Sequence, residues 1–184
     1  EILQDLQGPR IRTGFDVPAK GIVLKKGSKI EIGFGKYKKG FLPIDYKDLI
    51  DDIDVGTEIL FSDGMIETEV IKKEKNKAVI KILVGGAIYA RKGVNIPNAH
   101  LSISPITDKD KEDIKWGLRN KVDYIALSFV QNERDILHLR SLVKNKKIKI
   151  IAKIERPQAL KNLRRILKVV DGVMVARGDL GIEI

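Results

Sequence analysis

Two different patterns of hydrophobic and polar residues divide the chain. From about residue 16 to residue 97, short segments such as LKKGSKIEIGF alternate apolar and polar positions and are separated by glycine turns. An Asp63-Gly64 pair stands between two of these segments, and Asp-Gly is a frequent hairpin turn. Period-two alternation with closely spaced turns is typical of a small antiparallel β-domain or barrel. We therefore predict such a domain over residues 16–97.

The second pattern, over residues 98–184, alternates strand-like with helix-like segments. The apolar runs VDYIALSFV, IKIIAKI and DGVMVA are typical of buried strands, whereas ITDKDKEDIKWGLRNK, ERDILHLRSLVKN and PQALKNLRRILKVV have amphipathic helical spacing. Residues 1–15 contain one further candidate strand. Strand–helix alternation with short links predicts right-handed βαβ units around a parallel sheet. The fold class predicted from the pattern is therefore α/β, with a separate β-domain.

Composition narrows the class of protein. The 184 residues are 43% hydrophobic, which is enough for a packed core in one domain or two small ones. The chain has no cysteine, and this excludes a disulfide framework, thiolate metal sites and thiol catalysis. No apolar stretch is long enough to span a bilayer, and the first residues lack a secretory signal. We expect a cytoplasmic protein with no membrane partner.

The formal net charge is +10, from 35 Lys and Arg against 25 Asp and Glu. An excess of this size attracts nucleic acid, membrane surfaces or phosphorylated small molecules. The basic residues are widely spread, and only 5% of residues are aromatic, which leaves few rings to stack on bases. A solvated lysine-rich surface is the simpler interpretation, and no nucleic-acid partner is expected.

Candidate chemistry gathers where the predicted strands end. Ser128 and Phe129 follow one strand, while Lys153 and Glu155 stand two apart at the end of the next and so share a face. That lysine and glutamate can simply pair with each other. Asp179, after the third strand, changes the picture, because two carboxylates at one edge suit Mg²⁺ or Mn²⁺. A cation beside the metal suits an anionic substrate whose charge grows during reaction.

Glycine and arginine add two weaker signals. Gly178 lets backbone N–H groups approach a ligand carboxylate or phosphate closely, although a loop glycine needed only for its backbone angles is the alternative. Arg10 and Arg12, in GPRIRTG, share a face if the strand continues there. Arginine recognises phosphate through paired hydrogen bonds, but solvent-facing arginines on an edge strand are equally compatible with the pattern.

Six segments together resemble the pyruvate kinase family, in that family's order and over essentially the whole chain. They are DLQGPRIRTG, RKGVNIP, ITDKDKEDIKWGL, VDYIALSFV, IAKIE and DGVMVARGDLGIEI. The resemblance implies a partial (β/α)8 TIM barrel with an inserted small antiparallel β-barrel lid domain. Residues 1–15 would be a barrel strand of the catalytic domain, residues 16–97 the lid, and residues 98–184 further βα units of an incomplete barrel.

The resemblance also implies an activity, the transfer of the phosphoryl group of phosphoenolpyruvate to ADP, which gives ATP and pyruvate in glycolysis. Lys153 would be the catalytic cation, and Glu155 and Asp179 would hold Mg²⁺ or Mn²⁺. The backbone at Gly178 and Asp179 would receive the substrate carboxylate. The implied substrate-binding set is Lys153, Gly178, Asp179, Ser128 and Phe129.

On the nucleotide side, the resemblance implies that Arg12 and Lys92 contact nucleotide phosphates and that Asp63 lies on the inner side of the lid. Lid closure would exclude water and so reduce loss of the phosphoryl group to hydrolysis.

The monovalent-cation position departs from the pattern of many family members. Arg10 stands where those members carry an acid and need K⁺, whereas members that work without K⁺ place a cation there. The resemblance thus favours K⁺ independence. Asp5 matches a K⁺ ligand of the family and keeps the opposite interpretation open, and Leu6 would contribute only its backbone carbonyl.

By the same resemblance the chain runs from the third to the sixth barrel strand. It is then expected to be a fragment, inactive alone, of a parent enzyme that forms a homotetramer. Two alternatives remain. One is an autonomous, non-catalytic metal- or nucleotide-binding module, and the other is a basic nucleic-acid-binding β-domain, which the set of motifs disfavours.

Overall fold

The computed structural model describes residues 1–99, 101–144 and 147–184. The chain forms two compact units, Glu1–Pro9 with Ser104–Ile184 and Arg10–Ile103. The second unit extends beyond the expected range 16–97 at both ends. In the described part of the chain, no helix has the length and apolar character needed to cross a membrane.

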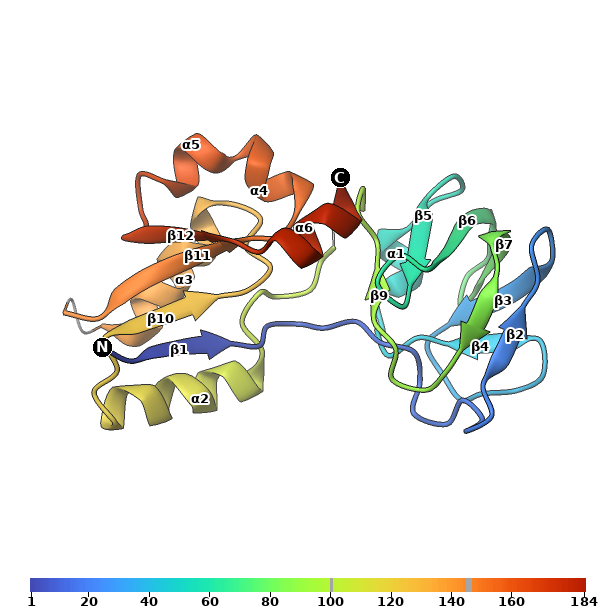
Figure 1. Ribbon diagram of the computed structural model, residues 1–184, viewed down its shortest axis with the longest axis horizontal. Helices are drawn as coiled ribbons and strands as arrows, with labels where there is room; N and C mark the ends of the chain where they lie inside the picture. Colours follow the sequence, from blue (N-terminus) through green and yellow to red (C-terminus); the bar gives the residue numbers. More distant parts are fainter. Residues whose placement is uncertain (100, 145–146) are drawn as a thin grey trace. The chain divides into compact units, whose positions relative to one another are not determined.

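A four-stranded parallel sheet forms the centre of the first unit (Figure 1). Its strands, in spatial order, are β1 (Leu3–Leu6), β10 (Tyr124–Leu127), β11 (Lys149–Ile154) and β12 (Gly172–Val175), and each neighbouring pair is parallel. This confirms the α/β arrangement predicted from the alternation of strand-like and helix-like segments. Since the strands run in one direction, their carboxyl ends meet at one edge of the sheet.

The described part of this unit contains five helices. They are α2 (Asp108–Arg119), α3 (Glu133–Val143), α4 (Pro157–Lys161), α5 (Leu163–Ile166) and α6 (Arg177–Glu183). The two longest, α2 and α3, begin at capping boxes. Thr107 caps α2: its hydroxyl accepts a hydrogen bond from Asp110 N, while the Asp110 carboxylate accepts one from Thr107 N. The single helix expected in PQALKNLRRILKVV is instead two short helices, α4 and α5, which meet at Asn162.

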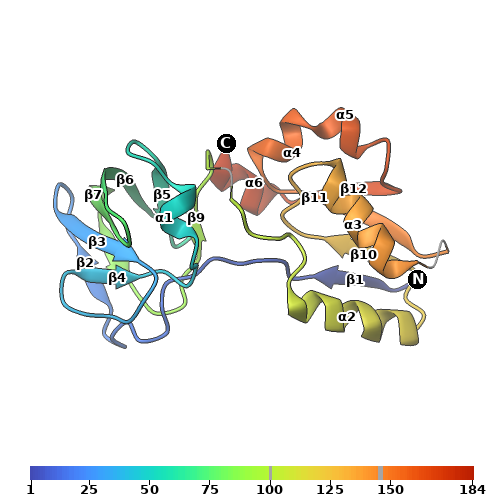
Figure 2. The ribbon, with the colours of Figure 1, turned by 180° about the vertical axis from the view of Figure 1, so that it is seen from behind.

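One face of the parallel sheet is covered by α3, which lies behind the sheet in Figure 1 and in front of it in Figure 2. Ile136 and Leu139 of α3 are buried in one hydrophobic cluster with Ile150 and Ala152 of β11. Because side chains alternate along a strand, Lys153 leaves β11 on the opposite face, away from this cluster.

The second unit is built mainly of antiparallel strands. They are β2 (Ile22–Leu24), β3 (Lys29–Gly33), β4 (Phe41–Pro43), β5 (Glu58–Phe61), β6 (Ile66–Lys73), β7 (Ala78–Val84), β8 (Gly86–Ile88) and β9 (Val94–Asn95), with one helix, α1 (Leu49–Asp52). Six strands form a sheet in the order β4-β3-β7-β6-β5-β9, and β2 pairs with β8. Among the described residues, β3 with β4 is the parallel exception.

The predicted Asp63-Gly64 hairpin is confirmed between β5 and β6. Ser62, Asp63 and Gly64 all have positive φ, of 52°, 58° and 83°, so the turn depends on residues that tolerate the left-handed region.

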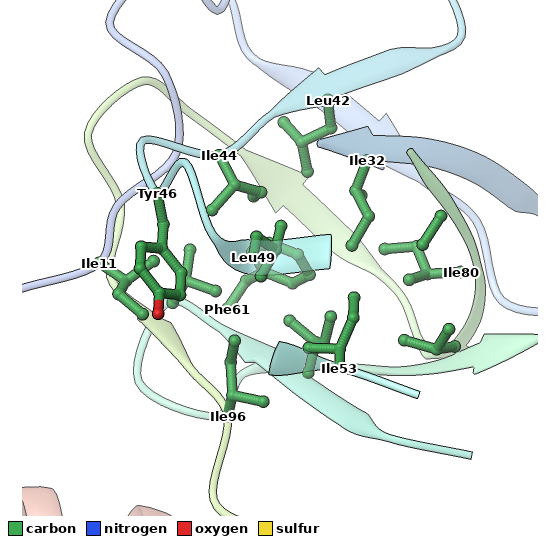
Figure 3. Packing of buried hydrophobic residues seen from close by; sticks show 14 of the residues in the cluster. Ile11, Ile32, Leu42, Ile44, Tyr46, Leu49, Ile53, Phe61, Ile80 and Ile96 are labelled. Carbon is green, nitrogen blue, oxygen red and sulfur yellow. The ribbon is translucent and has the colours of Figure 1, made fainter. Parts of the chain in front are cut away.

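An apolar core fills the second unit (Figure 3). Ile32 and Ile80, from the paired strands β3 and β7, are fully buried with Phe61 of β5 and Leu49 of α1. Their side chains point toward one another in Figure 3, and burial of apolar surface of this kind is the main term that stabilises a small β-domain.

Candidate active site

Lys153 and Glu155 meet at the carboxyl end of β11. Lys153 Nζ lies 3.1 Å from Glu155 Oε1, and the two side chains are only 11% and 1% exposed. Their two-residue spacing predicts a shared face, and the structure brings the two side chains together as an ion pair. A buried carboxylate and a largely covered ammonium group are thus paired at this strand end.

Two neighbouring strand ends supply further partners of the lysine. Lys153 Nζ donates hydrogen bonds to Ser128 Oγ at 2.9 Å and to Asp5 Oδ2 at 3.2 Å. Strand order explains the meeting, because β10 lies between β1 and β11 and Ser128 follows β10 directly. The hydroxyl of Ser128 in turn donates to the carbonyl of Leu6 at 2.8 Å. We call Asp5, Ser128, Lys153 and Glu155 the lysine cluster.

The backbone at Phe129 holds the second oxygen of Glu155. Phe129 N donates to Glu155 Oε2 at 2.7 Å, and Phe129 has φ of 55°, which is uncommon for a residue other than glycine. A Cβ added to Gly8 would stand 3.0 Å from the Phe129 ring, so a glycine is needed opposite that ring. Backbone strain of this kind concentrates at functional sites, and here it directs an N–H group at a carboxylate.

The electrostatics of the lysine cluster keep its cation charged. Burial alone would lower the pKa of Lys153, but the hydrogen bond and charge of Glu155, together with those of Asp5, outweigh burial and raise this pKa above 10.5. Lys153 is therefore protonated at neutral pH, with the carboxylates of Glu155 and Asp5 as its partners.

Gly178 and Asp179 lie in the first turn of α6, directly after β12. The break after the third predicted strand is thus the start of a helix. Gly178 has no positive φ, and a Cβ added there would meet no atom within 4 Å, so neither backbone angle nor crowding requires glycine. Within the described residues, no hydrogen bond or ion pair joins Asp179 to the lysine cluster.

The donor set is compatible with a hard divalent ion. No group of three or more His, Asp or Glu side chains in the described ranges is arranged to hold a metal ion. Mg²⁺ and Mn²⁺ sites commonly use only one or two carboxylates together with waters and substrate oxygens. Each Glu155 oxygen accepts one hydrogen bond and retains a second lone pair, so Glu155 fits such a site.

The residues expected to bind nucleotide gather on neighbouring segments of the second unit. Arg12 donates from Nη1 to the carbonyl of Arg91 at 2.8 Å and forms a β-bridge with Gly93. The exposed Lys92 is held between these positions, because its backbone N–H donates to Thr13 Oγ1 at 2.9 Å. Asp63 Oδ1 would stand 3.7 Å from a Cβ added at Gly93.

The three residues of the expected monovalent-cation position fall in different units. Asp5 and Leu6 belong to the first unit, and the exposed Arg10 is the first residue of the second. Asp5 contacts Lys153, and the Leu6 carbonyl accepts from Ser128.

Sequence reasoning missed one buried ion pair in the first unit. Arg156 Nε lies 3.2 Å from Glu183 Oε2, and the side chains are 5% and 4% exposed. The two residues are 27 positions apart, and no spacing rule links a residue after one strand to the end of a later helix.

Together, the parallel sheet and the lysine cluster at its strand ends define an α/β domain with a polar site at the edge where such sheets bind ligands. Residues 1–184 match the family model described as pyruvate kinase, barrel domain. The chain therefore belongs to the pyruvate kinase family.

Curated relatives agree with this assignment. The chain is 44% identical to a pyruvate kinase of Agrobacterium vitis over 187 residues, 42% to that of Geobacillus stearothermophilus over 192, and 38% to that of Clostridium perfringens over 189. Each alignment covers 100% of this chain but only 38%, 32% and 40% of the respective relative. The chain thus spans about a third of the length of the relatives it matches.

Proposed function

We propose that this chain provides part of the active site of a pyruvate kinase, which transfers the phosphoryl group of phosphoenolpyruvate to ADP and gives ATP and pyruvate. Membership of the family supports the proposal. The observation that carries it is the lysine cluster, where a cation with a raised pKa stands beside a buried carboxylate at the ends of parallel strands. The first unit would then be part of a TIM barrel, and the second unit the inserted lid.

In this proposal Lys153 is the catalytic cation. Negative charge develops on the transferring phosphoryl group and on the enolate that it leaves, and a fixed ammonium group stabilises that charge. Ser128 and Asp5 orient the ammonium group through hydrogen bonds of 2.9 and 3.2 Å, so little reorganisation is needed during reaction. Ser128 and Phe129 would line the substrate pocket.

Glu155 and Asp179 would hold Mg²⁺ or Mn²⁺. When bound, the ion supplies positive charge to the substrate oxygens without any proton transfer. The free backbone at Gly178 and Asp179 would receive the carboxylate of phosphoenolpyruvate, and the open space around Gly178 is compatible with that role. In the second unit, Arg12 and Lys92 would contact the nucleotide phosphates, with Asp63 on the same side.

We also propose that the enzyme works without K⁺. Arg10 is exposed and forms no ion pair with the described residues, so its guanidinium is available to replace the charge of a monovalent ion. Turnover by the full-length product of the encoding gene should be equal in sodium and potassium buffers. A gain of tenfold or more from K⁺, on the order of 1.4 kcal/mol, would contradict this assignment and favour a K⁺ ligand role for Asp5.

The proposed activity is tested by coupling pyruvate formation to NADH oxidation by lactate dehydrogenase. The full-length gene product should turn over phosphoenolpyruvate only when both ADP and Mg²⁺ are present. Residues 1–184 expressed alone should show little or no turnover. A full-length product that binds Mn²⁺ or ADP but forms no pyruvate would instead indicate a non-catalytic binding module.

A further inference from the structure

The pair of Arg156 and Glu183 is the most deeply buried ion pair in the described part of the chain. Both side chains are at most 5% exposed, whereas every other ion pair there has at least one partner exposed by a tenth or more. Removing two charges from water carries a large desolvation penalty, and apolar side chains of similar volume often give equal or greater stability. A requirement for fixed geometry is a better explanation of this pair than stability alone.

The pair connects two segments that carry proposed site residues. Arg156 directly follows Glu155 and directly precedes α4, while Glu183 is the last residue of α6. The side chain of Glu155 contacts Lys153, and that of its neighbour Arg156 contacts Glu183. The dipeptide Glu155–Arg156 therefore contains the proposed metal ligand, Glu155, and the arginine that pairs with the end of α6.

A second contact ties the start of α6 to the parallel sheet. Ala176 N donates to the Ile154 carbonyl at 3.2 Å, which ties the beginning of α6 to the end of β11. Leu180, in the middle of α6, is also buried, with 9% of its surface exposed. The preceding strand β12 lies at the sheet edge, with Val173, Met174 and Val175 exposed by 42, 36 and 56%. The ion pair adds a buried polar contact at the far end of α6.

We propose that Arg156 is a positioning residue that, through Glu183, fixes α6 so that Gly178 and Asp179 in its first turn are held at a set distance from Glu155. The proposal rests on the proposed function, in which Glu155 and Asp179 share the metal and the Gly178 backbone receives the substrate carboxylate. In this proposal Arg156 acts through Glu183 and is not itself a ligand of the metal or the substrate. Its planar fork of donors fixes direction as well as distance, which a lysine would do less well.

The kinetic signature of positioning differs from that of simple destabilisation. In the full-length gene product, Arg156→Met should raise the KM for phosphoenolpyruvate and the Mn²⁺ concentration for half-activation roughly 10- to 100-fold, as loss of an outer-shell partner does at metal sites. The KM for ADP should change by less than about twofold, because the proposed nucleotide residues lie in the other unit. A purely structural role would lower kcat with the folded fraction and leave both KM values unchanged.

Arg140→Met is the matched control. Arg140 pairs with Asp171 at 2.8 Å. Asp171 directly precedes β12, whereas α6 follows that strand, so this variant breaks an ion pair at the end of β12 that is away from α6. It should lower the midpoint of thermal unfolding but leave the KM for phosphoenolpyruvate and the Mn²⁺ requirement unchanged. For Arg156→Lys, the KM for phosphoenolpyruvate and the Mn²⁺ requirement should lie between those of the wild type and Arg156→Met.

If Arg156→Met folds poorly, the KM for phosphoenolpyruvate can be measured in the double variant Arg156→Met with Glu183→Met. This variant removes both charges together and retains apolar volume, so neither charge is left buried without the other. Because the double variant still lacks the directional contact between residues 156 and 183, the raised KM for phosphoenolpyruvate should remain. Recovery of wild-type KM in the double variant would show that packing alone is sufficient and would overturn the proposal.

Hydrogen exchange separates this proposal from the proposed function. Amides of α6 should exchange faster in Arg156→Met than in the wild type or in Arg140→Met. If the wild-type gene product does not turn over phosphoenolpyruvate, the proposed function fails, and faster exchange confined to α6 still supports anchoring by Arg156. Unchanged exchange in α6, whatever the turnover, would overturn the positioning role.

Discussion

The two units of this chain place their polar residues differently. In the second unit, the buried polar side chains among the described residues are two threonines, Thr13 and Thr68, and the core is apolar. In the first unit, the buried polar and charged residues are Asp110, Ser128, Gln131, Glu155, Arg156 and Glu183. Four of these six carry a full charge when ionised. Charged groups are rarely buried unless they are paired, so this difference indicates which unit has a chemical task.

The difference indicates that the second unit contributes mainly an apolar core, whereas the first unit carries the charged groups suited to chemistry. The described part of the second unit has a continuous apolar core of 22 buried residues, whereas the first unit also holds charged side chains at the ends of β1 and β11, with the Ser128 hydroxyl after β10. Buried charges keep electrostatic interactions strong because the local dielectric is low, and they also carry a desolvation penalty. Substitutions should therefore affect stability most in the second unit and activity most in the first.

The largest expected stability effect is in the apolar core. Phe61 is fully buried, and Phe61→Ala should lower the free energy of unfolding of the second unit by about 3–5 kcal/mol. Phe15→Ala, at a phenylalanine that is 77% exposed, is the control and should have little effect. Urea unfolding can follow the units separately, because the only tryptophan, Trp116, lies on α2 in the first unit. A Trp116 transition shifted as far as the circular dichroism signal would show that the units unfold together.

The next effect should be specific to the first unit. Asp110 is fully buried, and its carboxylate accepts hydrogen bonds from Gly8 N at 3.2 Å and Thr107 N at 2.8 Å. Asp110→Ala removes the capping box and leaves Gly8 N without its partner, so we expect a loss of about 2 kcal/mol in the Trp116 transition. Asp108→Ala, on the exposed first turn of the same helix, should shift that transition by less than about 0.5 kcal/mol.

A smaller effect of opposite sign should distinguish two glycines. Gly64 has φ of +83°, so Gly64→Ala should destabilise the β5–β6 hairpin by about 1 kcal/mol. Gly181, within α6, has no positive φ and no neighbour within 4 Å of an added Cβ. Gly181→Ala should therefore stabilise the first unit by about 0.5–1 kcal/mol. Thermal unfolding of both variants checks the sign, and destabilisation by both would refute this difference.

The smallest effect is a pH dependence. A lysine whose pKa is raised in the folded state contributes stability that is complete below the unfolded pKa and lost as pH rises through the folded pKa. The pKa of Lys153 is raised above 10.5 by Glu155 and Asp5, against the effect of burial. The difference in unfolding midpoint between the wild type and Lys153→Met should thus shrink as pH rises past 10.5. A constant difference from pH 7 upward would contradict the raised pKa.

Local signals in the sequence predicted much of the first unit. The cap at Thr107 and the buried stripe of α3 follow from side chains within one or two helical turns. The shared face of Lys153 and Glu155 follows from the two-residue period of a strand. The roles assigned to these residues came from the family resemblance and stay predictions.

Long-range contacts were beyond sequence reasoning. The ion pair of Lys153 with Asp5 joins residues 148 positions apart, and it depends on strand order that local patterns do not encode. The start of α6 at Arg177 was also missed, because a Gly-rich segment has low helix propensity and tertiary contacts decide its conformation. The division of PQALKNLRRILKVV into α4 and α5 also involves a long-range contact. The Asn162 side-chain amide donates to the carbonyl of the distant Gln131 as well as to that of Gln158.

Lys153→Met in the full-length gene product shows whether the lysine cluster is the phosphoryl-transfer site. Lys149→Met is the control, since Lys149 begins the same strand, is exposed and stands four residues earlier on the same face. With phosphoenolpyruvate, ADP and Mg²⁺ in the coupled assay, Lys153→Met should lose on the order of 10³-fold or more in kcat, while Lys149→Met keeps near-wild-type turnover. Circular dichroism should show that both variants are folded. Near-wild-type turnover by a folded Lys153→Met would contradict the assignment of the lysine cluster as the phosphoryl-transfer site.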